Sequence, residues 1–398
     1  MNRLITSWGE TALTRFPEDP RDPLRAWDAA DEYLLRHLAD EGTDLSGSLV
    51  VLGDRWGALT VSLAAHGPVQ LTDSYLGRRA TSANLARNAG SAPGAPPVVL
   101  RSVRDEPPER IDVLLVRVPK SLALLEDQLH RLAPAIHADT VVIGTGMVNE
   151  IHTSTLRLFE RLVGPTRTSL AVRKARLIFC TPDPALPRTP SPWPLRYALP
   201  DDIGAMSGRT VTNHSGVFCA DRLDIGTRFF LGVLPAPEGP VDVVDLGCGN
   251  GVVGTAAAVA SPGVSVTFVD ESFSAVASAR ETYRDNVPGG DDRAAFLVGD
   301  GLADLPDDSA DLVLCNPPFH SHRATTDTTA RRMFTDARRV LRPGGELWVV
   351  GNRHLGYHVR LRRIFGDCET VAGHPKFVVL RAVAPASGGT GRSRTGTR

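Results

Sequence analysis

Short apolar runs alternate with longer mixed segments throughout the second half of the chain. The run Leu312–Cys315 is apolar in every position, which is typical of a parallel strand covered on both faces. The predicted strands are 241–246, 264–269, 295–299, 311–315 and 346–351. The predicted helices are 252–260, 272–286 and 329–341, with a turn at 342–345. This βαβ order predicts an α/β fold with a parallel sheet.

The first half repeats the same plan. Its strand and glycine turn (49–57) align with 241–251, and its helix 80–88 corresponds to 275–286. Residues 112–120 align with 311–319, and Thr72-Asp73-Ser74 echoes Asp270-Glu271-Ser272. Between the halves, residues 181–195 hold six prolines in fifteen positions, which predicts a stiff linker. The predicted parts are domains 1–180 and 196–385, the linker 181–195, and a basic, disordered tail 386–398.

A glycine-rich turn follows the strand 241–246 in the second half. Glycines there permit positive φ and a close approach of the backbone to a ligand. There is no Gly-Lys-Ser/Thr sequence, which excludes a P-loop NTPase. Asp245 precedes the turn and suits a cationic ligand end, such as the methionine part of S-adenosylmethionine, better than a pyrophosphate.

Acidic residues also end the next two predicted strands. Asp270 comes about twenty residues after the turn, where a carboxylate can accept from ribose hydroxyls. Asp300-Gly301 ends the following strand, where a carboxylate can accept from an adenine amine. The predicted cofactor-binding residues are Asp245, Gly247, Cys248, Gly249, Asn250, Gly251, Asp270, Asp300, Gly301 and Asn316.

The tetrad Asn316-Pro317-Pro318-Phe319 follows the strand 311–315. The Asn316 side-chain carbonyl and a prolyl backbone carbonyl can each accept one hydrogen of a planar amino group, and prolines supply no competing N–H. An aromatic ring can stack on the amine-bearing base. These four residues are therefore the predicted catalytic group, which orients an amine for methyl transfer. A Pro-Pro turn that only ends a strand is the structural alternative.

With both signatures in place, residues 216–383 resemble the bacterial rRNA guanine-N2 methyltransferases. The matching segments are Leu223–Gly226, Val244–Gly254, Phe268–Ser272, Ala275–Ser278, Leu314–His320, Asn352–Leu355 and Lys376–Leu380. Asn352–Leu355 and Val269–Ser272 favour the large-subunit (23S) type over its small-subunit (16S) sister. The resemblance implies two tandem Rossmann-like class I methyltransferase domains, of which the first is degenerate.

The resemblance also implies the reaction, which is S-adenosylmethionine-dependent methylation of a guanine N2 amine in 23S rRNA. The flipped guanine would stack on Phe319, and its proton would leave to water, with His320 and His322 as weaker candidates for a base. Phe218 and Asp224 could line the mouth of the pocket. The alternatives are a 16S guanine, an adenine N6 or glutamine N5 amine, and a non-catalytic rRNA-binding assembly factor.

Substitutions in the first half predict that it has lost the cofactor. Arg55 and Trp56 replace Gly249 and Asn250, and we align Val118 with Asn316. We therefore expect no S-adenosylmethionine in this half, and the resemblance implies a role in RNA recognition; simple stabilisation of the catalytic half is the alternative. The candidate phosphate contacts are Arg78, Arg79, Arg87, Arg101, Arg104, Lys120 and Arg173.

Composition narrows the class of protein only modestly. The 398 residues are 42% hydrophobic, which is ordinary for a globular chain of two to three domains. No run approaches the ~18 apolar residues of a membrane span. Five cysteines without a Cys-x-x-Cys pair predict neither a metal site nor disulfides. We expect a cytoplasmic monomer. With a net charge of −1, RNA binding would need a local basic patch.

Overall fold

The computed structural model describes residues 2–19, 22–89, 94–318 and 323–386. The chain divides into two compact units, Met1–Pro194 and Leu195–Arg398, apart from Ser272–Ser274, which group with the first. The division falls inside the proline-rich segment 181–195. Phe319, His320, His322 and the tail from Ser387 lie outside the described residues.

The second unit is built on a seven-stranded sheet. In chain order its strands are β12 (Val241–Leu246), β13 (Val264–Asp270), β14 (Ala294–Val298), β15 (Ala310–Cys315), β16 (Leu341–Asn352), β17 (Glu369–Gly373) and β18 (Phe377–Val383). The spatial order is β14-β13-β12-β15-β16-β18-β17, parallel except where β18 pairs with β16 and β17. A hairpin of β10 (Leu195–Ala198) and β11 (Thr210–Asn213) precedes the sheet.

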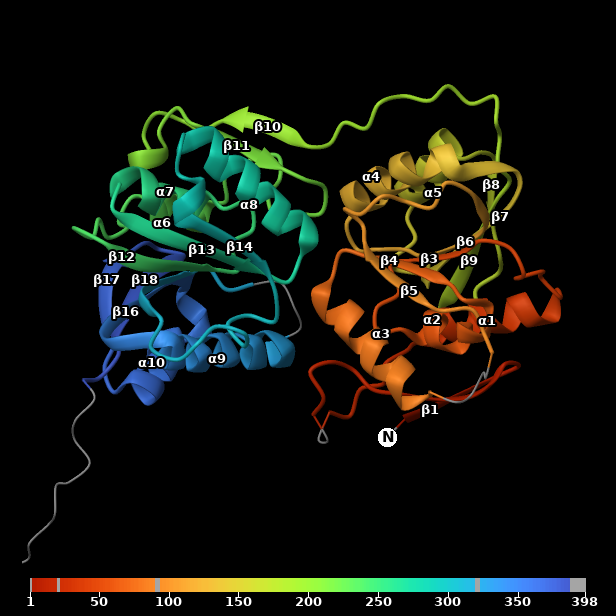
Figure 1. Ribbon diagram of the computed structural model, residues 1–398, viewed down its shortest axis with the longest axis horizontal. Coiled ribbons are helices and arrows are strands. Elements are labelled where there is room, and N and C mark those ends of the chain that lie inside the picture. The colour runs from red at the N-terminus through yellow and green to blue at the C-terminus, as the bar shows by residue number, and fades with distance from the viewer. Residues whose placement is uncertain (1, 20–21, 90–93, 319–322, 387–398) are drawn as a thin grey trace, which may run out of the picture. The chain divides into compact units, whose positions relative to one another are not determined.

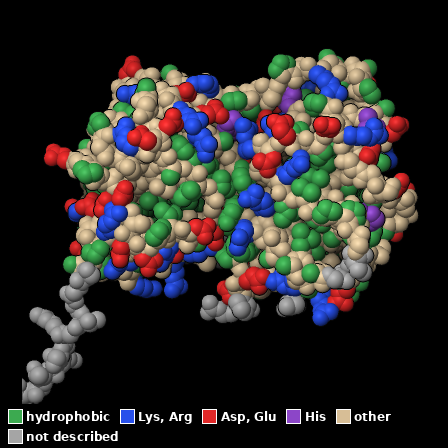
Figure 2. Space-filling model, viewed as in Figure 1, with side chains coloured by type: hydrophobic (Ala, Val, Ile, Leu, Met, Phe, Trp, Pro, Cys, Tyr) green, Lys and Arg blue, Asp and Glu red, His purple; other side chains and the backbone are tan. Residues whose placement is uncertain are grey.

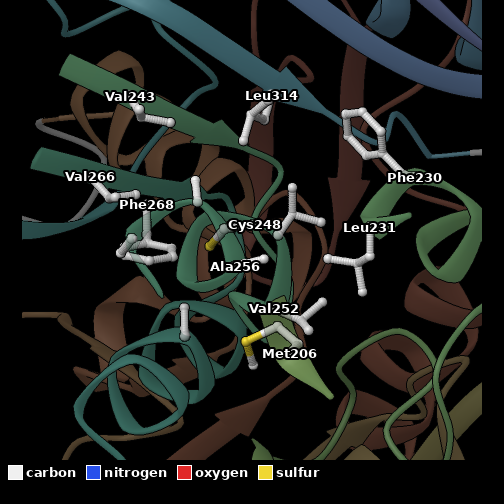
Figure 3. Packing of buried hydrophobic residues seen from close by; sticks show 14 of the residues in the cluster. Met206, Phe230, Leu231, Val243, Cys248, Val252, Ala256, Val266, Phe268 and Leu314 are labelled. Atoms are coloured by element: carbon white, nitrogen blue, oxygen red, sulfur yellow. The ribbon is translucent and has the colours of Figure 1, made fainter. Parts of the chain in front are cut away.

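Helices cover both faces of this sheet (Figure 1). One face carries α6 (Ile225–Leu231), α7 (Val252–Ala260) and α8 (Phe273–Asn286), and the other carries α9 (Arg323–Val340) and α10 (Tyr357–Phe365). The helix α7 is apolar along almost its whole length and is buried on nearly all sides. Its core with the sheet includes Met206, Phe230 and Phe268 (Figure 3).

The first unit repeats this topology. A short hairpin of β1 (Asn2–Thr6) and β2 (Gly9–Leu13) precedes strands β3 (Leu49–Leu52), β4 (Val69–Thr72), β5 (Val99–Ser102), β6 (Ile111–Arg117), β7 (Ile136–Met147), β8 (Thr166–Thr168) and β9 (Ala175–Cys180). Their order is β5-β4-β3-β6-β7-β9-β8, the same as in the second unit. The helices are α1 (Ala29–Asp40), α2 (Ala58–Ser62), α3 (Tyr75–Arg87), α4 (Leu122–Leu132) and α5 (Thr153–Leu162).

The predicted α/β fold and its duplication are therefore confirmed, and the differences are local. The helix α9 begins at Arg323, six residues before the predicted start at 329. The predicted turn 342–345 lies within β16 as an interruption of the ladder, because Ala310 pairs with Leu341 and Leu312 already pairs with Glu346. The hairpin β10–β11 was not predicted.

The surface and the cysteines give little sign of further chemistry. Basic and acidic side chains are interspersed over the face in Figure 2, in keeping with the net charge of −1. Across the described ranges, no helix is long and apolar enough to cross a membrane, and no group of three or more His, Cys, Asp or Glu could hold a metal ion. Cys248 and Cys315 lie in the two hydrophobic cores of the second unit.

Candidate active site

The predicted site residues of the second unit meet at one edge of its sheet. Leu246, the last residue of β12, pairs with Val269 of β13 on one side and with Cys315 of β15 on the other. The residues that follow these three strand ends are the glycine turn, Asp270 and Asn316. Because parallel strands end on the same edge, the register brings the turn, the carboxylate and the amide together.

The glycine turn presents its backbone toward open space. Gly249 has a φ of +53°, and a Cβ built on it would meet no protein atom within 4 Å. Gly251 has a φ of +75°, and a Cβ there would lie 2.7 Å from Ala279 of α8. Gly251 is therefore required for packing, whereas the space at Gly249 suits a ligand that lies against the backbone.

Asp245 is buried beneath the turn. Its side-chain oxygen Oδ2 accepts a hydrogen bond of 2.8 Å from the backbone N–H of Gly254, at the start of α7. Burial is the main cause that raises the pKa of Asp245 to about 7. The negative charge of Asp270 adds to this rise, while the hydrogen bond from Gly254 opposes it. A cationic ligand group beside this carboxyl would favour its ionised form.

Asp270, at the end of β13, is hydrogen-bonded to the glycine turn. Its Oδ2 accepts a hydrogen bond of 3.0 Å from the backbone N–H of Gly249. The same carboxylate therefore shapes the turn and stands beside the open space at Gly249. This placement agrees with the predicted position near a ribose, but it also gives Asp270 a structural task that the sequence did not reveal.

Asn213, the last residue of β11, is a site residue that sequence reasoning missed. Its Oδ1 accepts a hydrogen bond of 2.9 Å from Nδ2 of Asn250 in the glycine turn. The side chain is buried, and its own Nδ2 has no hydrogen-bond partner in the described part of the chain. A buried donor without a partner is costly unless a ligand supplies the acceptor. No motif in the sequence marks this residue.

Asp300 is already engaged by a basic residue. Arg332 of α9 pairs with it through both guanidinium nitrogens, with Nη1 at 3.0 Å from Oδ2 and Nη2 close to Oδ1. Each carboxylate oxygen keeps further acceptor capacity, so an adenine amine could still donate to it. Arg332 was not among the predicted site residues, and its pairing fixes the orientation of this carboxylate.

Asn316 has an amide with one end held and the other end open. Its Nδ2 donates a hydrogen bond of 2.9 Å to the hydroxyl of Thr227 on α6. Its Oδ1 is buried and has no hydrogen-bond partner among the described residues. Pro317 is buried and Pro318 is exposed, whereas Phe319 lies outside the described residues. The side-chain carbonyl of Asn316, which the sequence assigns to a hydrogen of an amino group, is therefore available for a substrate.

The first unit has different chemistry at the equivalent edge. Leu52 of β3 pairs with Val116 of β6, as Leu246 pairs with Cys315. The residue that corresponds to Asn316 is therefore Arg117, and our alignment of Val118 with Asn316 is wrong by one residue. Only one proline, Pro119, follows the strand in the first unit, and our match took the residue directly before it as the counterpart of Asn316. Pro119 corresponds instead to Pro318, the second proline of the tetrad.

Arg117 is fully buried in an ion network. Its guanidinium lies 2.7 Å from Asp28, 3.3 Å from Asp31 and 2.9 Å from Glu150. Arg55, from the loop that corresponds to the glycine turn, adds a second cation at 2.6 Å from Glu150. Burial alone would raise the pKa of Glu150, but Arg117 and Arg55 outweigh it and lower the pKa to about 2. Protein charges thus occupy the strand end where the second unit has its open amide.

The side chains of the second unit fit S-adenosylmethionine. Asp245 could balance an ammonium, the unpartnered Nδ2 of Asn213 could bind a carboxylate, and Asp270 could accept from ribose hydroxyls. The open space at Gly249 would admit the ligand against the backbone.

Comparison with known proteins identifies the family. A model described as the RLMG N-terminal domain matches residues 1–184, and one described as the methyltransferase small domain matches residues 208–381. "Ribosomal RNA large subunit methyltransferase G" of Streptomyces avermitilis is 71% identical, over 96% of this chain and 98% of that protein. The chain belongs to the ribosomal RNA large subunit methyltransferase G family.

More distant members of the family also match this chain over almost its whole length. The protein of that name from Pseudomonas syringae pv. syringae is 48% identical, over 96% of this chain and 100% of its own. The one from Aeromonas salmonicida is 46% identical, over 96% and 98%. The resemblance to the large-subunit type is confirmed, and so is the prediction that the chain is a methyltransferase, against a non-catalytic assembly factor.

A solved structure shares the two-domain fold of this chain. It is the 16S rRNA N2 methyltransferase RsmC of T. thermophilus, in complex with AdoMet and guanosine. The TM-score is 0.71 at 21% identity, with 96% of this chain and 97% of that chain covered. At this identity the likeness concerns the fold, and it agrees with the predicted pair of methyltransferase-like domains.

Proposed function

We propose that this protein transfers the methyl group of S-adenosylmethionine to the exocyclic N2 amine of a guanine in 23S rRNA. The observation that carries the proposal is the buried, unpartnered Oδ1 of Asn316 at the end of β15. Family membership supports rRNA of the large subunit as the substrate. An acceptor without a protein donor suits an amino group, because an amino group on an aromatic ring donates hydrogen bonds but does not accept them.

Each residue of the site has a defined task in this reaction. When bound, S-adenosylmethionine supplies an electrophilic methyl group on a sulfonium, so that the amine nitrogen forms the new N–C bond while the C–S bond breaks. Asn316 and the Pro317 carbonyl hold the two amino hydrogens, which directs the nitrogen lone pair out of the ring plane. Phe319 stacks on the guanine. The nitrogen then loses one proton to water.

The residues in and around the glycine turn and at the ends of β13 and β14 hold the cofactor. Asp245 balances the ammonium, Asn213 binds the carboxylate through Nδ2, and Asp270 accepts from the ribose hydroxyls. Asp300 accepts from the adenine amine while Arg332 holds it in place. The backbone at Gly249 lies against the ligand, and the remaining predicted contacts come from Gly247, Cys248, Asn250, Gly251 and Gly301.

We also propose that the domain 1–180 binds no S-adenosylmethionine and takes part in RNA recognition, while 196–385 is the catalytic domain. The ion network around Arg117 supports the loss of cofactor binding. Among the candidate phosphate contacts, Arg87 is paired with Glu18 and Arg173 with Glu32, so RNA would have to compete with those carboxylates. The reaction is assigned to the cytoplasm and to a monomer.

The test is methyl transfer from labelled S-adenosylmethionine to purified, protein-free 23S and 16S rRNA, followed by nucleoside analysis. We expect N2-methylguanosine in 23S rRNA alone. The same product in 16S rRNA alone would overturn the assignment to the large subunit. Label on an adenine, or on a glutamine of a protein acceptor, would overturn the assignment of the guanine amine.

A further inference from the structure

We propose that Asp224 and Thr227, at the start of α6, are positioning residues that fix which end of the Asn316 amide faces the substrate. The inference rests on the proposed function, since it assigns Asn316 to the amine. It concerns the segment Leu223–Gly226, which carried part of the family resemblance but has no task in the cofactor site.

The direction of the hydrogen bonds is set by the carboxylate. Asp224 is the N-cap of α6, and its Oδ2 accepts from the backbone N–H of Thr227 at 2.9 Å and from the Thr227 hydroxyl at 3.2 Å. An ionised carboxylate only accepts, so the single hydroxyl hydrogen of Thr227 is committed to it. The Thr227 oxygen is then left as an acceptor toward Asn316.

This commitment decides the orientation of the amide. An oxygen that can only accept requires the NH₂ end of Asn316, and the observed contact is Nδ2 to Oγ1 at 2.9 Å. The flipped amide would place two acceptors face to face and lose the bond. Oδ1 of Asn316 is therefore the end that remains available, and it is the end that an amine needs.

Gly226 makes room for this arrangement. A Cβ on Gly226 would lie 3.0 Å from Oδ2 of Asp224 and 3.2 Å from the ring of Phe377. The carboxylate folds back over this position to reach Thr227. The sequence Asp224-Ile225-Gly226-Thr227 thus combines the acceptor, the space beside it and the hydroxyl within one helical turn.

The first unit uses the same two helix positions for a different partner. Asp28 is the N-cap of α1 and Asp31 is three residues later, as Thr227 is three residues after Asp224. Both acidic side chains reach Arg117, the residue that corresponds to Asn316. In each copy, therefore, the first turn of this helix holds the side chain at the end of the central strand.

The test compares methyl-transfer rates of Thr227→Val, Thr227→Ser, Asn316→Ala and the double variant Thr227→Val/Asn316→Ala. Valine has the shape of threonine without the hydroxyl, so the amide of Asn316 loses the hydrogen bond that fixes its orientation. We expect Thr227→Val to lower the maximal rate by about 10- to 100-fold, since small misplacements of reacting groups cost that much. The dissociation constant for S-adenosylmethionine, measured by calorimetry, should change less than about threefold. Thr227→Ser should restore most of the rate.

The double variant separates positioning from stability. Without the Asn316 amide there is nothing left to orient, so Thr227→Val should cost no further rate in the Asn316→Ala background. A matched control is Thr255→Val on α7, which is fully buried and whose hydroxyl has no partner in the described ranges. It should keep the wild-type rate.

Three results would overturn the inference: multiplicative losses in the double variant, an equal loss of cofactor affinity in Thr227→Val, or no recovery in Thr227→Ser. The proposed function fails separately, and it does so if the wild-type protein forms no N2-methylguanosine. The rate comparison is then made on whichever amine the wild type methylates, because any amino group requires the same orientation of Asn316.

Discussion

Arg117 and Asn316 occupy the same position in the two copies of the fold, one residue beyond the pair Leu52–Val116 and the pair Leu246–Cys315 respectively. Asn316 leaves a carbonyl open, whereas Arg117 is surrounded by carboxylates. One copy thus satisfies its strand end internally, and the other requires a ligand there. This difference is the physical basis for assigning catalysis to the second unit alone.

Replacing Arg117 by methionine should destabilise the first unit by about 3–5 kcal/mol, because it leaves the buried Asp31 without its cation and leaves Glu150 with Arg55 alone. Urea unfolding would measure the loss. The control is Arg110→Met, which removes an exposed pair with Asp112 and should cost no more than about 1 kcal/mol. S-Adenosylmethionine affinity should stay unchanged in both variants. A cofactor affinity that falls with Arg117→Met would contradict the assignment of the cofactor to the second unit.

Asn316→Ala should lower the methyl-transfer rate by about 10²- to 10³-fold, which is the usual effect of removing one preorganised polar group from a transition state. The dissociation constant of S-adenosylmethionine should change little, because the amide contacts the amine. Single-turnover rates and calorimetry on the same preparation would measure both quantities. An equal loss in rate and cofactor affinity would show that Asn316 belongs to the cofactor site instead.

Asp270→Asn should have the opposite effect and weaken S-adenosylmethionine by roughly 10- to 100-fold, which corresponds to about 1.5–3 kcal/mol for hydrogen bonds to a charged group. Asparagine keeps an oxygen for the N–H of Gly249, so the turn itself should persist. Calorimetry would give the affinity, and the rate at saturating cofactor should remain within a few-fold of wild type. Unchanged affinity would remove Asp270 from the proposed ribose contacts.

Asn213→Ala should weaken S-adenosylmethionine by about 10-fold, the value of a typical hydrogen bond to a charged group. The variant removes the unpartnered Nδ2 and also the contact with Asn250. Asn213→Asp serves as the matched control, because it keeps the acceptor for Asn250 and replaces the donor by a negative charge. It should bind the cofactor more weakly than the alanine variant. Stronger binding by the aspartate would contradict a carboxylate at this position.

The affinity for S-adenosylmethionine should depend on pH through Asp245, whose pKa is about 7 in the cofactor-free protein. A cationic ammonium favours the ionised carboxyl, so affinity should rise up to about pH 7, level off above it, and fall about tenfold per unit below it. Asp270 is the charged neighbour that raises this pKa, while burial raises the pKa of the Cys248 and Cys315 thiols, so they stay neutral.

The contribution of Asp245 to the free energy of unfolding should change with pH in the direction opposite to its effect on cofactor affinity. Its carboxyl is protonated in the folded protein and ionised in the unfolded chain between about pH 4 and pH 7, so the free energy of unfolding should fall as the pH rises through this window. Calorimetric titrations from pH 5.5 to 8 and urea unfolding over the same range would measure both trends. Asp245→Asn should flatten both profiles, and a flat wild-type binding profile would show that Asp245 does not pair with the ammonium.

The duplicated α/β plan could be predicted from the order of amino acids alone, because apolar strands, the glycine turn and the prolines after β15 are local signals. The sequence also indicated Asp245, Asp270 and Asn316, since each lies at the end of a strand or within one residue of it. Strand pairing in the tertiary structure replaced our match of Val118 to Asn316 by Arg117, and only the tertiary structure showed the carboxylates that surround this arginine, because they come from segments far away along the chain. The contacts of Asn213, Thr227 and Arg332 also come from the tertiary structure alone, since their partners lie 37, 89 and 32 residues away along the chain.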